Sequence, residues 1–185
     1  MSGKLFVISG ASGVGKSTVL GTVMKENTAL RFSVSATTRA PRPGETDGVQ
    51  YYFISKEKFK EMIAQDAFIE YDAHMDNYYG TPIAQLEEKL TSGDVILDIE
   101  PVGAFNVRRV RPDATLIFIA PPSMEELERR LRGRGDTSEE QMQLRLQRAR
   151  WEMEQSSKYD YIVINDQVEA CADEILNIIA LHNEQ

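Results

Sequence analysis

The chain has 185 residues, of which 42% are hydrophobic, so it has enough apolar material for one domain with a core of its own. Its formal net charge of −8 at pH 7 argues against a general nucleic-acid or membrane-surface binder. The single cysteine, Cys171, excludes an internal disulfide and a multi-cysteine zinc site. No apolar run is long enough to span a bilayer. We therefore expect a cytoplasmic protein with no nucleic-acid or membrane partner.

Along the chain, short apolar runs alternate with segments of helical period, which is typical of an α/β protein with a mostly parallel sheet. Four runs have the composition of buried strands: residues 5–8, 95–99, 116–119 and 161–164. A helix with the apolar residues Val19, Leu20 and Val23 is predicted after the first strand. Further helices are predicted from Thr81-Pro82 to Gly93, from capping boxes at 123–126 and 137–140, and around 175–179.

One stretch breaks this alternation. Residues 33–81 are rich in Tyr, Thr, Arg, Pro and Gly, with strand-like pieces around 34–36, 51–54 and 68–71 and one brief helix near Phe59, Met62 and Ile63. We predict a small β-rich lobe inserted into the core. A second candidate mobile piece is the segment 133–135, in which Arg134 lies between two glycines.

The segment 10–17 matches the phosphate-loop pattern G-x-x-x-x-G-K-[ST] in full. Glycines let the backbone curl so that its N–H groups face phosphate oxygens, and the following helix adds the positive end of its dipole. Lys16 would bridge the β- and γ-phosphates, and the Ser17 hydroxyl would ligate Mg²⁺. A chance glycine turn is the alternative, but the segment lies between an apolar strand and an apolar-striped helix. The sequence therefore predicts a nucleoside-triphosphate site formed by Gly10, Ala11, Ser12, Gly13, Val14, Gly15, Lys16, Ser17 and Thr18.

Arginines gather in two further blocks, around Arg39 and Arg42 and between residues 123 and 154. The second block holds seven arginines, no lysine and eight acidic residues. A salt-bridged solvent face is favoured for four of them, Arg129, Arg132, Arg148 and Arg150. The exclusive use of arginine nevertheless favours planar, bidentate recognition of phosphate, above all by the glycine-flanked Arg134.

Taken together, these motifs resemble the guanylate kinase family. They are GASGVGKS at 10–17, SVSATTR at 33–39, PRPGE at 41–45, GVQYYF at 48–53, FIEY at 68–71, NYYGT at 77–81, DIE at 98–100 and RLRGRG at 130–135. They cover nearly the whole chain in the right order. The resemblance implies an α/β fold with a P-loop NTPase-type core, a mostly parallel sheet flanked by helices, an inserted β-rich GMP-binding lobe and a helical lid. It implies one domain over 1–185, with core segments 1–33, 82–123 and 146–185, a lobe at 34–81 and a lid at 124–145.

The resemblance also implies the activity, which is transfer of the γ-phosphate of ATP to GMP with Mg²⁺ as cofactor, with dGMP as a further candidate acceptor. It implies a role for each residue of the motifs. It assigns the GMP phosphate to Arg39, Arg42, Tyr51 and Tyr79, and guanine to Ser35, Glu70, Thr81 and Glu100. It assigns the ATP phosphates and the phosphoryl group in transfer to Arg130, Arg134 and Arg145, and the adenine side to Asn165. Asp98, counted with the GMP-binding set, would act on the water shell of a metal held by Ser17. Lys16, Arg39, Arg134 and Arg145 are the catalytic candidates.

The chemistry of the substrates supports this assignment independently. A carboxylate such as Glu70 can accept both N–H donors of guanine, whereas adenine leaves it unpaired. Two unit charges about 4 Å apart at an effective dielectric near 20 repel by about 4 kcal/mol, so arginines and Mg²⁺ are needed to bring two phosphates together. No general base is needed, because a phosphate monoester with a pKa near 6 is already largely deprotonated at neutral pH.

Two departures and two alternatives stand beside this interpretation. Glu100 and Val102 replace the Asp and Gln that the family usually has, so two side chains expected near the acceptor differ from the usual ones. One alternative is a kinase of the same fold for another phosphorylated acceptor. The other is a non-catalytic guanylate-kinase-like protein-binding module, which the intact Lys16 and Ser17 disfavour. The chain is expected to be a monomer or a homodimer.

Overall fold

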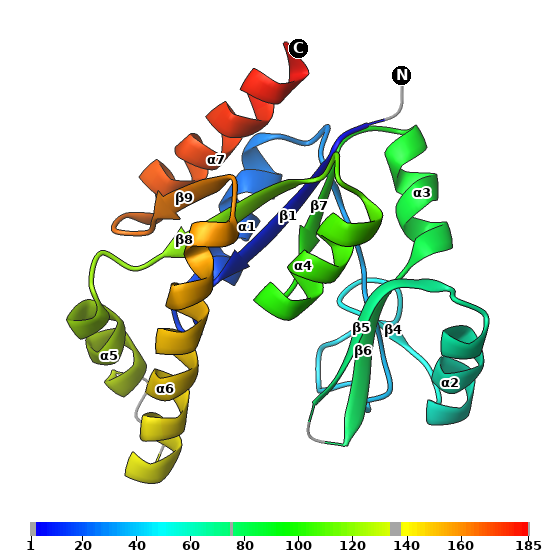
Figure 1. Cartoon of the computed structure of the whole chain (residues 1–185), viewed down its shortest axis with the longest axis horizontal. Coiled ribbons are helices and arrows are strands. Elements are labelled where there is room, and N and C mark those ends of the chain that lie inside the picture. The colour runs from blue at the N-terminus through cyan, green and yellow to red at the C-terminus, as the bar shows by residue number, and fades with distance from the viewer. Residues whose placement is uncertain (1–2, 75, 134–137, 185) are drawn as a thin grey trace. The chain divides into compact units, whose positions relative to one another are not determined.

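The computed structural model describes residues 3–74, 76–133 and 138–184, so Arg134 lies outside the described residues. The chain forms two compact units (Figure 1). One unit consists of residues 6–28 and 115–185 and contains the phosphate loop. The other consists of residues 1–5 and 29–114 and contains the predicted lobe at 34–81.

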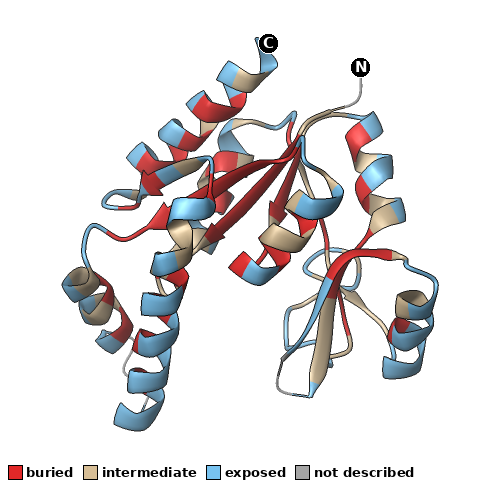
Figure 2. Ribbon diagram, viewed as in Figure 1, coloured by how far each residue is buried: buried red, intermediate tan, exposed pale blue. Residues whose placement is uncertain are grey.

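The phosphate-loop unit is built on parallel strands. Its elements are β1 (Leu5–Gly10), α1 (Lys16–Glu26), β8 (Thr115–Ala120), α5 (Met124–Arg132), α6 (Glu139–Gln155), a 3₁₀ turn (Ser156–Lys158), β9 (Tyr161–Ile164) and α7 (Val168–Asn183). Strand β8 pairs in parallel with β1 on one side and with β9 on the other. Every residue of β8 is buried, as expected for a parallel strand covered on both faces (Figure 2). Helices α1 and α7 pack against each other.

The other unit contains a separate, mixed sheet. The elements of this unit are β2 (Arg31–Phe32), β3 (Ala36–Thr37), β4 (Tyr52–Phe53), α2 (Lys56–Ala64), β5 (Phe68–His74), β6 (Asn77–Pro82), α3 (Ile83–Thr91), β7 (Val95–Asp98) and α4 (Pro101–Val110). The sheet has the order β4-β3-β6-β5, with β6 antiparallel to both neighbours, while β2 pairs in parallel with β7. A small core holds this sheet on α2: Phe59 is fully buried and stacks on Phe68 at 4.3 Å between ring centroids.

The fold class predicted from the sequence is confirmed, because the four apolar runs form β1, β7, β8 and β9 in an α/β protein. Both capping boxes also begin helices, with the hydroxyls of Ser123 and Ser138 accepting from the N–H groups of Glu126 and Gln141. The limits of the lobe and the lid stay predictions. No helix among residues 3–74, 76–133 and 138–184 is long and apolar enough to cross a membrane.

The predicted helix start at Thr81-Pro82 is wrong. Both residues belong to strand β6, and the helix begins at Ile83. Pairing between β6 and β5 extends the strand to Pro82, and the Thr81 hydroxyl donates to a buried carboxylate instead of capping the helix. Strands β2 and β6 and helix α4 were not predicted, because their short or glycine-containing sequences carry little periodic signal.

Candidate functional site

The phosphate loop joins the end of β1 to the start of α1. Gly15 caps the helix with a φ of +92°, a left-handed conformation that favours glycine. A Cβ at this position would lie 3.0 Å from Nδ2 of Asn165, which is a tight contact. The N-terminus of α1 follows directly at Lys16. The positive end of a helix dipole at such a position favours an anion.

Asn165 follows strand β9 and is hydrogen-bonded to the loop. Its side chain is buried, and Nδ2 donates to the carbonyl of Val14 at 2.7 Å. The backbone carbonyl of Asn165 accepts from NH1 of Arg130 at 2.9 Å, and Arg130 also pairs with Glu126 at 2.8 Å. Asn165 and Arg130, predicted as ATP contacts, therefore lie at the loop and are linked to each other.

Glu152 is a residue at this loop that the sequence analysis missed. It lies in α6, is 1% exposed, and accepts the backbone N–H of Ser12 at 2.6 Å. Arg148 donates to its other oxygen at 3.0 Å. The only signal in the sequence was the spacing of an arginine and a glutamate four residues apart, which is also typical of solvent-exposed helix pairs.

Three further predicted residues of this unit lie on α1 and α6. Ser17 and Thr18 are exposed in the first turn of α1. Arg145 is exposed on α6. Arg134 lies outside the described residues, so its predicted catalytic role stays a prediction.

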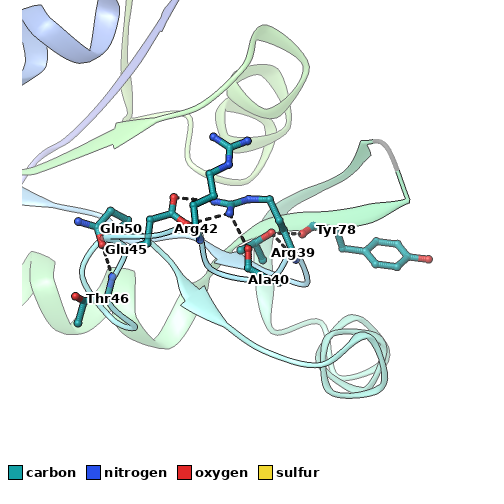
Figure 3. Close-up of polar contacts among 8 residues, drawn as sticks. Arg39, Ala40, Arg42, Glu45, Thr46, Gln50 and Tyr78 are labelled. Atoms are coloured by element: carbon teal, nitrogen blue, oxygen red, sulfur yellow. Dashed lines mark hydrogen bonds and ion pairs between the residues drawn. The ribbon is translucent and has the colours of Figure 1, made fainter.

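In the other unit, Arg39 is the centre of a second cluster (Figure 3). Its guanidinium makes a bidentate ion pair with the carboxylate of Glu45, with both N···O distances at 2.9 Å, and also donates to the carbonyl of Ala40 at 2.7 Å. It lies 5.5 Å from the ring centroid of Tyr51, and the rings of Tyr51 and Tyr79 meet edge to face. The structure thus brings together three of the four residues predicted to bind the GMP phosphate.

Arg42 is the fourth of these residues. Its backbone N–H donates to Glu45 at 2.7 Å, while its side chain is exposed and extends away from the ion pair in Figure 3. The Arg39 guanidinium, together with this N–H, lowers the pKa of the Glu45 carboxyl to about 2. Glu45 is therefore ionised throughout the neutral range and holds Arg39 in one orientation.

Glu70 is the centre of a third cluster, at the bulge in β5. The side chain is buried, and one oxygen accepts the Thr81 hydroxyl at 2.6 Å. Thr81 in turn lies 3.4 Å from the hydroxyl of Ser35. The other oxygen approaches α4, where a Cβ on Gly103 would lie only 2.9 Å from it. Burial raises the pKa of the Glu70 carboxyl, against the lowering effect of its hydrogen bonds with Thr81.

Strand β6 connects the second and third clusters. Tyr79 and Thr81 are two residues apart on this strand, so their side chains lie on the same face. Tyr79 belongs to the Arg39 cluster, and Thr81 belongs to the Glu70 cluster. One face of β6 therefore connects a cationic site to a buried acceptor site.

Comparison with known proteins identifies the family. The guanylate kinase family model matches residues 2–181. This chain belongs to the guanylate kinase family. It is 48% identical to a guanylate kinase of Thermus thermophilus over 97% of this chain and 81% of that protein. It is also 48% identical to a guanylate kinase of Clostridioides difficile over 96% of this chain and 87% of that protein.

A solved structure agrees with this assignment. The crystal structure of guanylate kinase from Anaplasma phagocytophilum matches with a TM-score of 0.79 and 33% identity, covering 100% of this chain and 88% of that chain. A shikimate kinase from Bacteroides thetaiotaomicron, at 12% identity and a TM-score of 0.51, shares the fold alone. The family predicted from the motifs is confirmed.

The two positions at which this guanylate kinase family member departs from the usual pattern lie where β7 passes into α4. Glu100 is the residue before Pro101, the first residue of α4, and Val102 is 49% exposed in the first turn. Asp98 is the last residue of β7 and is partly buried. Asp98 and Glu100 thus lie on either side of Ile99 at the junction of β7 and α4. Their predicted contacts with GMP stay predictions.

Proposed function

We propose that this chain transfers the γ-phosphate of ATP to GMP, giving ADP and GDP. The observation that carries the proposal is the buried carboxylate of Glu70, whose second oxygen lies beside α4 in a chain of the guanylate kinase family. Guanine offers two N–H donors, at its ring nitrogen and its exocyclic amine, to such a carboxylate. Adenine would leave the buried charge without a donor, which is the arrangement that discriminates most strongly between substrates.

The GMP phosphate would bind at the Arg39 cluster. Glu45 and the Ala40 carbonyl take both N–H groups of NH1 and one of NH2, which leaves the Nε edge of the guanidinium for other partners. The hydrogen bond with Glu45 raises the pKa of Arg39, and Tyr79, which also lies at Arg39, adds to this effect. With the exposed Arg42, these side chains supply the positive charge and hydroxyl donors that a phosphate monoester requires.

In the transfer itself, an oxygen of the GMP phosphate bonds to the γ-phosphorus. The bond from that phosphorus to the oxygen bridging to the β-phosphate breaks, and ADP leaves with the electron pair. Lys16 and the backbone N–H groups of the loop would hold the β- and γ-phosphates, while Arg130, Arg134 and Arg145 would offset the charge that develops. The rate then comes from positioning and electrostatics rather than from a general base.

Mg²⁺ fits the residues at the start of α1. The exposed hydroxyl of Ser17 is a hard oxygen donor of the kind that Mg²⁺ prefers, and Mg²⁺ bound with ATP keeps several water ligands. Asp98 would act on those waters. When bound, the ion neutralises charge on the β- and γ-phosphates.

A substrate panel tests the proposed function. ADP release is measured with ATP and Mg²⁺ and with GMP, dGMP, AMP, UMP, dTMP or ribose 1,5-bisphosphate as acceptor. We expect turnover with GMP, and a loss of kcat of about 10³-fold in Lys16→Met, because a phosphate-binding cation is removed from the transition state. Turnover only with another acceptor would contradict the assignment of Glu70 to guanine. Binding of ATP without turnover of any acceptor would favour the protein-binding module.

A further inference from the structure

Glu152 is a buried charged residue to which the transfer reaction described above gives no role. It lies on α6 at 1% exposure, far in sequence from the phosphate loop that it contacts. A buried carboxylate is unfavourable unless its oxygens are hydrogen-bonded and its charge is paired. Here Oε2 accepts the Ser12 N–H at 2.6 Å, and Oε1 accepts from Arg148 at 3.0 Å. The phosphate loop supplies one of the bonds that make this burial possible.

The contact fixes the loop on the side of Gly13 that Asn165 does not reach. Asn165 holds the carbonyl of Val14 at 2.7 Å, on the C-terminal side of Gly13. Glu152 holds the N–H of Ser12, on the N-terminal side. A loop that binds phosphate through backbone N–H groups works best when those groups already point at the ligand site. The two side chains, from different elements, restrain the main chain on both sides of its glycine.

The charge of Glu152 is balanced before any nucleotide binds. The side chain of Arg148 is 43% exposed and pairs with Glu152. The pair therefore presents no net charge to an anionic ligand at the loop. Its influence on phosphate binding is then exerted through the position of the backbone.

The same helix carries one of the catalytic candidates. Arg145 lies seven residues before Glu152 on α6, which is about two turns, or about 10 Å along the axis, so both lie on one side of the helix. A bond from Glu152 to the loop thus fixes the position of this helix, and of Arg145 on it, relative to Ser12.

We propose that Glu152 is a positioning residue for ATP. It orders the phosphate loop and holds α6 in a fixed position against the loop. The proposal rests on the proposed function, because it takes the loop as the site of the ATP phosphates. It concerns only the phosphate-loop unit, so removal of Glu152 weakens ATP binding and leaves GMP binding unchanged. A residue needed only for stability would not separate the two nucleotides in this way.

The test compares Glu152→Gln with Glu154→Gln in the full-length chain. Glu154 is an exposed residue of the same helix, two positions on, so it is a matched control for the loss of one carboxylate. Titration calorimetry with the non-hydrolysable analogue AMP-PNP plus Mg²⁺, and separately with GMP, gives both dissociation constants. In Glu152→Gln we expect the constant for AMP-PNP to rise about tenfold, the scale of a lost charged hydrogen bond, and that for GMP to stay within twofold. Glu154→Gln is expected to bind both as the unsubstituted chain does.

A second pair of variants keeps the test decisive if Glu152→Gln does not fold. Arg148→Gln removes the ion pair with Glu152 and leaves Glu152 itself in place. Arg150→Gln, on the same helix, is the control for this variant. We expect Arg148→Gln to weaken AMP-PNP binding about threefold and to leave GMP binding unchanged. Unchanged AMP-PNP binding in the folded variants, or equal losses for AMP-PNP and GMP, would overturn the proposal. Failure of the unsubstituted chain to bind either nucleotide would instead contradict the proposed function.

Discussion

The two predicted anion sites of this molecule are built in different ways. At the phosphate loop the main chain is the group that would bind the anion. Buried side chains such as Glu152 and Asn165, which are 1% and 3% exposed, hold that main chain in place. At the acceptor site the side chain of Arg39 is the group that would bind the anion. Glu45 holds it in an ion pair whose two side chains are 16% and 17% exposed. A main-chain site is set by the fold, whereas a side-chain site depends on a local counter-charge. A substitution at the acceptor site should therefore act on ligand binding more selectively than a substitution at the loop.

The largest effect expected within the acceptor unit is at Glu70. Glu70→Gln replaces one acceptor oxygen by an NH₂ donor, which then faces the donors of guanine, so we expect kcat/KM for GMP to fall about 10²–10³-fold. Activity with AMP, whose ring nitrogen is an acceptor, is expected not to fall. Steady-state kinetics with both acceptors at saturating ATP measure the change.

Glu61→Gln is the control for this variant. Glu61 is exposed on α2, and we expect the kinetics of this variant to equal those of the unsubstituted chain. Equal losses for GMP and AMP in Glu70→Gln would show that the carboxylate supports the lobe without selecting the base. The difference between a selective acceptor site and a fold-determined loop would then disappear.

A smaller effect is expected at Glu45. Glu45→Gln removes the charge that orients Arg39, so we expect the dissociation constant for GMP to rise about tenfold. Guanosine, which has no phosphate, is expected to bind as before. Titration with the two ligands separates these effects, and Glu61→Gln, an exposed residue of α2, is the control.

The opposite sign in this experiment has a clear meaning. If Glu45→Gln binds GMP more tightly, the carboxylate competes with the phosphate for Arg39 instead of positioning it. Counter-charge at the acceptor site would then be inhibitory.

The same contrast explains how much the sequence could predict. A main-chain site leaves a contiguous pattern, so residues 10–17 identified the loop without any structure. The strands 5–8 and 116–119 were equally clear, because buried parallel strands are continuous apolar runs. The partners that hold each site were not visible: Glu152 is 140 positions from Ser12, and its spacing from Arg148 is that of an ordinary surface pair.

Thr81 shows why a local signal can point the wrong way. A threonine followed by proline is typical of a helix start, and the sequence gives no sign that this hydroxyl belongs to Glu70 on the neighbouring strand. Tertiary pairing between β5 and β6 decides the outcome. The motif resemblance assigned Thr81, Glu70 and Ser35 together to guanine. The structure brings these three side chains together, and their contacts with guanine stay predictions.

The smallest expected effect is a pH dependence at Glu70. Burial raises the pKa of this carboxyl above its ordinary 4.5, so the folded chain holds this proton more tightly than the unfolded chain does. The contribution of Glu70 to stability is therefore most favourable below pH 4.5 and falls as pH rises through the raised pKa. Guanine donates two N–H groups, so it binds the ionised form and its affinity should rise by a few-fold over the same window.

Guanosine is the ligand that isolates this effect, because the phosphate of GMP itself titrates near pH 6. The dissociation constant for guanosine is measured from pH 4.5 upward at fixed ionic strength, in the unsubstituted chain and in Glu70→Gln. We expect affinity to rise with pH in the first and to be flat in the second, with a proton released on binding only in the first. A pH-independent affinity in the unsubstituted chain would mean that Glu70 is already ionised before the base arrives. Preorganisation of charge would then be common to the buried acceptor site and the phosphate loop, and the difference between them would be confined to Arg39 and Glu45.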